Sequence, residues 1–315
     1  METKKSTRLS SFVPIQNMFF FEVSIGIMAN TVLLFHFLTV LLQHMPKPTD
    51  LTTGHLAFIH LTMLLTVGFM YIDIFHFQDF WNDITCKCVL YLYRLMRGLS
   101  VCTTCLLSVL QAITLSPRSS CLARFKQKTL HQNLCCFLFL WVFNMIISSR
   151  FLISTVATPN VSSQSLMFVT ESCSLWPISY SVKYMYVSLM TFRDVFFIGL
   201  MVLSSGYMVI LLYWHKKQSK YLRSISLSPK ASPERRATQT ILLLMSFFMI
   251  MYFSDSVIAS TSGMLWKNVP IHYCVQMLLA NGYATVSALV LISTEKLITK
   301  ASVYVGKVNK CLIIH

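Results

Sequence analysis

Eight ionisable side chains interrupt long apolar stretches of this sequence, and their chemistry most needs an explanation. They are Glu22, Asp73, Arg94, Arg97, Arg150, Arg193, Asp194 and Asp255. A charge in apolar surroundings is costly unless it is paired or hydrated. Because four acids balance four bases, the set predicts ion pairing or the binding of a polar ligand.

Five of these residues are candidates for a ligand pocket or for its immediate support: Arg94, Arg97, Arg193, Asp194 and Asp255. Arg94 and Arg97 are three residues apart, so they share one face of a helix. For Glu22 and Arg150 we favour a structural role instead. Such side chains pair within a helix bundle or extend toward lipid headgroups.

Motifs for catalysis, cofactors and metals are absent from the sequence. It contains no G-x-S-x-G, H-E-x-x-H, P-loop or G-x-G-x-x-G pattern. The ten cysteines show no zinc spacing, and Cys102-Thr-Thr-Cys105 lies in an apolar run where cysteine usually acts as a small hydrophobic residue. We therefore predict a protein that is not an enzyme and that holds neither cofactor nor metal.

Composition indicates which solvent surrounds these residues. The 315-residue chain is 55% hydrophobic and 12% charged, with a mean hydropathy of +0.62, whereas soluble domains carry about 25% charged residues. The formal net charge is +15. The basic residues form short clusters between apolar runs, which favours lipid headgroups and a protein partner over nucleic acid.

Seven apolar segments are long enough to cross a bilayer as helices, each with about 20 residues or more. They are 18–42, 52–76, 89–115, 133–156, 183–213, 238–262 and 270–293. The second and seventh contain His55, His60, Asn281 and Ser287, and should face the bundle interior. The sequence thus predicts an all-α integral membrane protein: a short terminus (1–17), a seven-helix domain (18–293) and a basic tail (294–315).

The connections between the spans predict the orientation of the chain. One set of alternate connections, together with the tail, contains sixteen basic residues, and the other set contains six. The positive-inside rule places the richer set in the cytoplasm and the N-terminus outside. Asn160-Val161-Ser162 then lies in a long outer loop, so Asn160 is a candidate glycosylation site. In this orientation the eight ionisable residues lie in the outer halves or near the middle of their spans. We therefore expect an outward-opening vestibule among spans 3, 5, 6 and 7.

Two cysteines are placed to tether the long outer loop. Cys86 opens the third span and Cys173 lies in the loop, both in an oxidising compartment. A disulfide between them would hold the loop over the vestibule, with Cys88 as the alternative partner for Cys173.

Long motifs of the chain resemble the vomeronasal type-1 receptors. They are YRLMRGLSVCTTCLLSVLQAITLSPRSSCLARFK from Tyr93, SSRFLISTVATPNVSSQSLMFVTESCS from Ser148, TFRDVFFIGLMVLSSGYMVILL from Thr191, SLSPKASPERRATQTILLLMSFF from Ser226 and YATVSALVLISTEK from Tyr283. The likeness runs from about Gly54 to Lys296. It implies a chemosensory receptor in the plasma membrane that binds a small-molecule pheromone or odorant and activates an inhibitory-type G protein. It also implies a Cys86–Cys173 disulfide and glycosylation at Asn160.

The inner contacts of such a receptor should come from the basic connections after spans 3 and 5. The candidate G-protein contacts are Arg118, Lys126, Lys216, Lys217, Arg235 and Arg236. The acidic-Arg-Tyr triplet of rhodopsin-like receptors is missing, and Leu115-Ser116-Pro117-Arg118 stands in its place. The family usually has proline where this chain has Ala288, and loss of that kink predicts a straighter helix and weaker activation.

Two other interpretations remain open at this stage. A transporter or channel would also be a basic, polytopic membrane protein, but it would need polar residues on both sides of its midplane site. A bitter-taste-type receptor is a related chemosensory alternative, against which the motifs of spans 3 and 5 argue.

Overall fold

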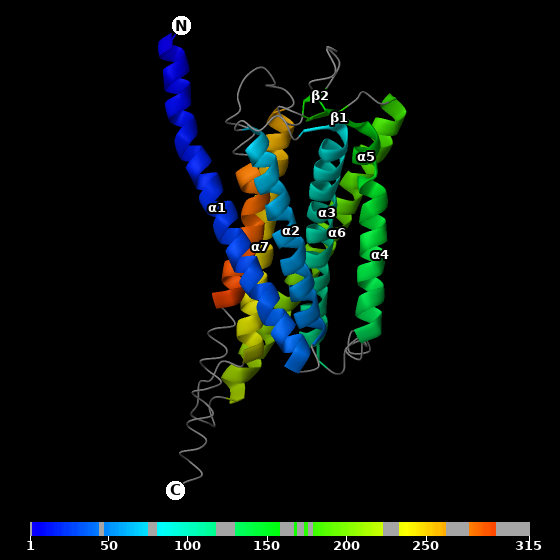
Figure 1. Ribbon diagram of the computed structural model, residues 1–315. Coiled ribbons are helices and arrows are strands. Elements are labelled where there is room, and N and C mark those ends of the chain that lie inside the picture. Colours follow the sequence, from blue (N-terminus) through cyan, green and yellow to red (C-terminus); the bar gives the residue numbers. More distant parts are fainter. Residues whose placement is uncertain are drawn as a thin grey trace.

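The computed structural model describes residues 2–43, 47–74, 81–117, 130–157, 167–168, 173–175, 179–222, 233–262 and 277–293. These residues form an elongated bundle of helices with a small cap of strands at one end (Figure 1). We call the capped end the disulfide end and the other the opposite end.

The first four long helices run alternately along the bundle. They are α1 (Glu2–Gln43), α2 (Pro48–Ile74), α3 (Asp83–Leu115) and α4 (Leu130–Ser148). α1 begins well before the predicted span, and its first turns extend beyond the other helices at the disulfide end (Figure 1). α4 is followed by the short α5 (Arg150–Ser154), so the predicted fourth span ends in a separate helical turn.

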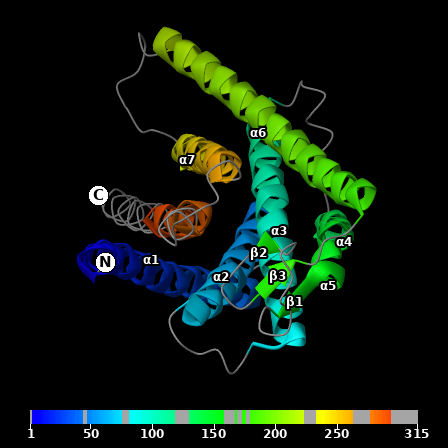
Figure 2. The same cartoon turned by 90° about the horizontal axis from the view of Figure 1, so that it is seen from above.

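The remaining helices are α6 (Tyr180–Leu222), α7 (Pro233–Ser262) and a final apolar helix, Met277–Ser293. Viewed from above, α6 lies along one side of the bundle, while α3 passes between α2, α4 and α6 (Figure 2). Six of the described helices are long and apolar enough to cross a membrane, and Met277–Ser293 is a shorter apolar helix. All seven coincide with predicted spans.

α3 is the central element, and its sequence explains both its start and its burial. Asn82 caps its N-terminus, because the Asn82 side chain accepts a hydrogen bond from the Thr85 amide at 2.8 Å. Most α3 side chains from Leu95 to Leu110 are buried. Two apolar clusters meet on it, one with α1 and α2 and one with α6 and α7.

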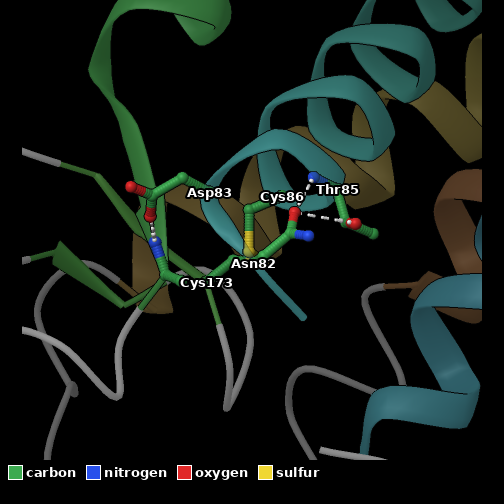
Figure 3. The surroundings of a disulfide bond; sticks show 6 residues. Asn82, Asp83, Thr85, Cys86 and Cys173 are labelled. Carbon is green, nitrogen blue, oxygen red and sulfur yellow. Dashed lines mark hydrogen bonds between the residues drawn. A yellow bond between two sulfur atoms is a disulfide. The ribbon is translucent and has the colours of Figure 1, made fainter. Parts of the chain in front are cut away.

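A three-stranded antiparallel sheet forms the cap, a feature that the sequence did not predict. Its strands are β1 (Thr155–Ala157), β2 (Met167–Phe168) and β3 (Cys173–Leu175), in the order β1-β3-β2. Two links fasten this sheet to the start of α3 (Figure 3). Cys86 and Cys173 form a disulfide, and the Asp83 Oδ1 accepts a hydrogen bond from the Ala157 amide at 2.7 Å. The predicted pairing is confirmed, and Cys88 is exposed and outside any disulfide.

Candidate ligand-binding site

A cavity lies between α2, α3, α7 and the Met277–Ser293 helix, on the disulfide side of the bundle's middle. The cavity volume is about 30 Å³. Its wall is mostly apolar, with a few polar groups. The lining residues are Met63, Arg97, Ser100, Val101, Phe248, Met251, Tyr252, Asp255, Leu279, Ala280 and Tyr283. An apolar wall with a few convergent polar groups is typical of small-molecule sites.

An ion pair forms the polar part of this wall. The Arg97 Nη2 donates a hydrogen bond to the Asp255 Oδ2, and so connects α3 to α7. Asp255 is only 5% exposed, whereas Arg97 is half-buried. The Arg97 Nη1 also donates to the Tyr93 hydroxyl over a long 3.4 Å. The second carboxylate oxygen, Asp255 Oδ1, is buried without a hydrogen-bond partner among the described residues.

A second ion pair lies beside the cavity and reaches two further helices. The Arg193 Nε donates to the Asp194 Oδ1 at 2.8 Å, and the Arg193 Nη1 donates to the Asn144 Oδ1 at 3.1 Å. The Tyr252 hydroxyl donates to the Asp194 Oδ2 at 2.6 Å. Since Tyr252 lines the cavity, this network of α4, α6 and α7 supports the cavity wall.

Gly98 makes room for this network on α3. A Cβ atom added at Gly98 would meet the Arg193 Nη1 and the Asn144 Oδ1, each at 2.4 Å. The glycine follows Arg97 directly, so one turn of α3 contributes both to the cavity and to the packing of Arg193.

The cavity's remaining polar groups are held by a network on its opposite-end side. The buried His60 of α2 makes a 2.8 Å hydrogen bond with Ser100 and a 3.3 Å hydrogen bond with Ser287. The Tyr283 hydroxyl is 3.4 Å from the Thr104 hydroxyl. The prediction that polar residues of spans 2 and 7 face the interior is confirmed for His60, Asn281 and Ser287.

Comparisons with known proteins identify the family of this chain. The model of the vomeronasal organ pheromone receptor family matches residues 13–303. Vomeronasal type-1 receptor 90 of Rattus norvegicus is 52% identical over 298 residues, which cover 94% of this chain and 96% of that receptor. Vomeronasal type-1 receptor 51 of Mus musculus is 49% identical over 293 residues, covering 93% and 92%.

The chain belongs to the vomeronasal type-1 receptor family. It is therefore a chemosensory receptor of the plasma membrane and not an enzyme. Squid rhodopsin shares its fold, with a TM-score of 0.69 over 89% of this chain and 76% of the rhodopsin, at 17% sequence identity. The seven-helix membrane fold expected from the sequence is confirmed.

The structure of this vomeronasal receptor separates the five predicted pocket residues into three groups. Arg97 and Asp255 line the cavity, and Arg193 and Asp194 lie behind Tyr252. Arg94 does not line it: the Arg94 side chain is exposed and its guanidinium carbon lies 5.1 Å from the centre of the Phe151 ring. Residues three apart on a helix differ by about 60° in direction, which suffices to send Arg94 and Arg97 to different neighbours.

The helices that line the cavity differ in one member from the spans predicted to surround the vestibule, which were spans 3, 5, 6 and 7. α2 lines the cavity through Met63, whereas none of the described residues of α6, the fifth span, lines it. The Asp194 side chain of α6 instead accepts a hydrogen bond from Tyr252 of the wall. Sequence reasoning missed Tyr252, Asn144 and Ser100. Their polar groups within apolar spans were the available signal, but such residues are common in helix bundles.

Glu22 lies on the buried side of α1. Both of its carboxylate oxygens are buried without a hydrogen-bond partner among the described residues, so the predicted pairing within the bundle is not seen in that part of the chain. The neighbouring contact is with the Met277–Ser293 helix, where the Thr285 hydroxyl donates to the Glu22 carbonyl at 3.2 Å.

The candidate G-protein contacts are described only in part. Arg118 and Lys126 lie outside the described residues, as does Asn160. Lys216 and Lys217 lie near the end of α6, and Arg235 and Arg236 in the first turn of α7, both at the opposite end of the bundle (Figure 1). The Lys217 side chain is exposed there.

Hydroxyl groups connect α3 and α6 in this half of the receptor. The Ser108 and Ser204 hydroxyls are 2.6 Å apart, and the Ser116 hydroxyl is 2.7 Å from the Tyr207 hydroxyl. Ser116 is the C-cap residue of α3.

Proposed function

We propose that this receptor binds a small amphiphilic pheromone or odorant in the Arg97–Asp255 cavity and activates an inhibitory-type G protein. The observation that carries the proposal is the position of the ion pair. It lines the cavity and at the same time joins α3 to α7. A ligand that contacts the pair therefore changes the relative free energies of different packings of these two helices.

A ligand shifts such an equilibrium only through its different affinities for the two packings. The Arg97–Asp255 pair supplies that difference, because its geometry depends on how α7 lies against α3. The network of Arg193, Asp194 and Tyr252 extends the effect to α4 and α6.

The G protein binds at the opposite end in this proposal, against basic residues of the connections. Arg235 and Arg236 belong to α7, whose packing against α3 the ligand changes. Lys216 and Lys217 belong to α6, to which the Asp194–Tyr252 hydrogen bond extends the effect, and Arg118 and Lys126 belong to the connection after α3. The disulfide end and the N-terminus then face outward, and Asn160 is glycosylated on that side. The excess of basic residues in the alternate connections supports this orientation.

Expression in cells with a cyclic-AMP reporter tests the function. A library of volatile and amphiphilic compounds should contain agonists that lower cyclic AMP, and pertussis toxin should abolish the response. The Lys183→Gln variant, altered on an exposed side chain at the disulfide end of α6, should respond like the wild type. Agonist responses that persist in toxin-treated cells would contradict the inhibitory coupling.

A transporter or channel is the rival class. It would produce substrate flux or current in liposomes that contain only the receptor. The proposed function predicts neither.

A further inference from the structure

The unused hydrogen-bonding groups of the cavity wall indicate what kind of polar group a ligand must carry. Three wall residues already have partners: Ser100 is bonded to His60, Tyr252 to Asp194 and Tyr283 to Thr104. Among the described residues of the wall, Arg97 and Asp255 have the most hydrogen-bonding groups without a partner.

These two residues offer opposite halves of a hydrogen-bonding site. A guanidinium has five N–H donors, and the described residues provide Arg97 with two acceptors. Asp255 Oδ1 is an acceptor to which no described residue donates. A buried acceptor that lacks its donor is destabilising, so a ligand that donates a hydrogen bond to Asp255 Oδ1 gains affinity. Donor and acceptor are adjacent because the two residues form an ion pair.

The charge balance of the pair limits the charge of the ligand. Arg97 and Asp255 together carry no net charge, and the same holds for Arg193 and Asp194 behind them. An anionic group would be attracted by Arg97 and repelled by Asp255, and a cationic group would meet the reverse. Both would also lose their hydration without a full counter-charge, which is costly in an apolar site.

We propose that the ligand's polar end is an uncharged group that carries a hydrogen-bond acceptor for Arg97 and a donor for Asp255 Oδ1, attached to an apolar body. A primary amide has this arrangement. The apolar body lies against Val101, Phe248 and Met251. This assignment rests on the proposed function and specifies the ligand class of the same cavity.

Matched compounds test the assignment on the wild-type receptor. A primary amide, an N,N-dimethyl amide, a carboxylate and an amine are compared on the same linear, branched and polycyclic carbon frameworks. The primary amide should be about tenfold or more as potent as each of the others, since a hydrogen bond to a charged group contributes about 1.5–3 kcal/mol. Equal potency of the N,N-dimethyl amide, which lacks the donor, would overturn the proposal, as would a preference for the carboxylate or the amine.

Charge-changing variants provide a reciprocal test. Asp255→Asn leaves Arg97 without its counter-charge, so the carboxylate should gain about tenfold in potency relative to the amide. Arg97→Gln should favour the amine in the same way. Lys183→Gln and Asp50→Asn change one charge each outside the cavity and should preserve the wild-type order of potency.

The two levels of failure are distinguishable. If a charged class is the most potent in the wild type, or if Asp255→Asn leaves the order unchanged, the head-group assignment is wrong while the cavity remains a receptor site. If no class activates receptors that surface labelling detects, the proposed function fails and the assignment with it. Should a variant not reach the surface, the comparison of the two amides on the wild type still decides.

Discussion

The two halves of this receptor bundle are held together by different kinds of polar contact. Toward the disulfide end, ion pairs and charge-assisted hydrogen bonds join α3 to α7, α4 to α6 and α6 to α7. Toward the opposite end, neutral hydroxyl pairs join α3 to α6. Charge-assisted hydrogen bonds are roughly twice as strong as neutral ones.

This difference assigns different tasks to the two halves. Buried charges tolerate little misplacement, because an unpaired charge in an apolar site is costly, so the disulfide half should keep a defined ligand cavity. Hydroxyl pairs contribute about 1 kcal/mol each and exchange partners readily. The opposite half is therefore suited to rearrange when a partner binds.

The largest expected effect comes from breaking the buried Arg193 network. Arg193→Met removes the cation that contacts both Asp194 and Asn144, and should destabilise the receptor by about 3 kcal/mol. The thermal unfolding of the detergent-solubilised receptor measures the loss. Arg94→Met is the matched control, because Arg94 is exposed whereas Arg193 is buried, and an exposed charge contributes less to stability than a buried one.

A second substitution separates the lost charge from the lost packing. Adding Asp194→Leu to Arg193→Met removes the uncompensated carboxylate and should recover part of the stability. If the two arginine variants unfold at the same temperature, charge does not distinguish this half of the bundle.

A smaller effect is expected from overpacking the same network. Gly98→Ala places a Cβ against Arg193 and Asn144, and should cost about 2 kcal/mol because both side chains must move. Gly199→Ala is the control, since an added Cβ there meets no described atom within 4 Å. Gly199→Ala should unfold at or above the wild-type temperature. Equal losses of stability for Gly98→Ala and Gly199→Ala would show that the Arg193 and Asn144 side chains can accommodate the added Cβ atom.

Much of this architecture follows from the sequence, and the exceptions have physical causes. Long apolar segments predicted all seven helices, and the polar residues His60 and Ser287 identified interior faces. The sheet was missed because strands of two or three residues carry no periodic pattern. Arg94 and Arg97 are chemically identical in the sequence, and only the packing of α5 and α7 against α3 directs them to different sites.

In the opposite half, removal of one hydroxyl should change signalling more than stability. Tyr207→Phe deletes the bond with Ser116 and should cost the described packing about 1 kcal/mol. If that packing is the resting one, basal signalling rises about fivefold. Ser116→Ala removes the other partner of this bond and should also raise basal signalling. Tyr213→Phe, on an exposed tyrosine of α6, is the control, and a rise of basal signalling there would contradict a specific role for Tyr207.

The smallest effect on stability is expected from a proline at position 288, where the resemblance to the family leads us to expect one. A proline inside a helix normally costs about 3 kcal/mol, partly because it frees the carbonyl four residues earlier. Here that carbonyl belongs to Ala284, which already accepts hydrogen bonds from the Asn30 Nδ2 at 3.1 Å and the Ser287 hydroxyl at 3.3 Å. We therefore expect Ala288→Pro to cost less than about 1 kcal/mol, to reach the cell surface and to raise the maximal agonist response.

Val286→Pro is the control, because it frees the carbonyl of Gly282, which accepts no hydrogen bond from Asn30 or Ser287. This variant should not reach the cell surface. When Asn30→Ala is added to Ala288→Pro, the double variant should also fail to reach the surface. If Ala288→Pro and Val286→Pro reduce surface expression equally, the Asn30 side chain does not compensate for the freed Ala284 carbonyl. Replacing residue 288 alone then does not restore a stronger agonist response.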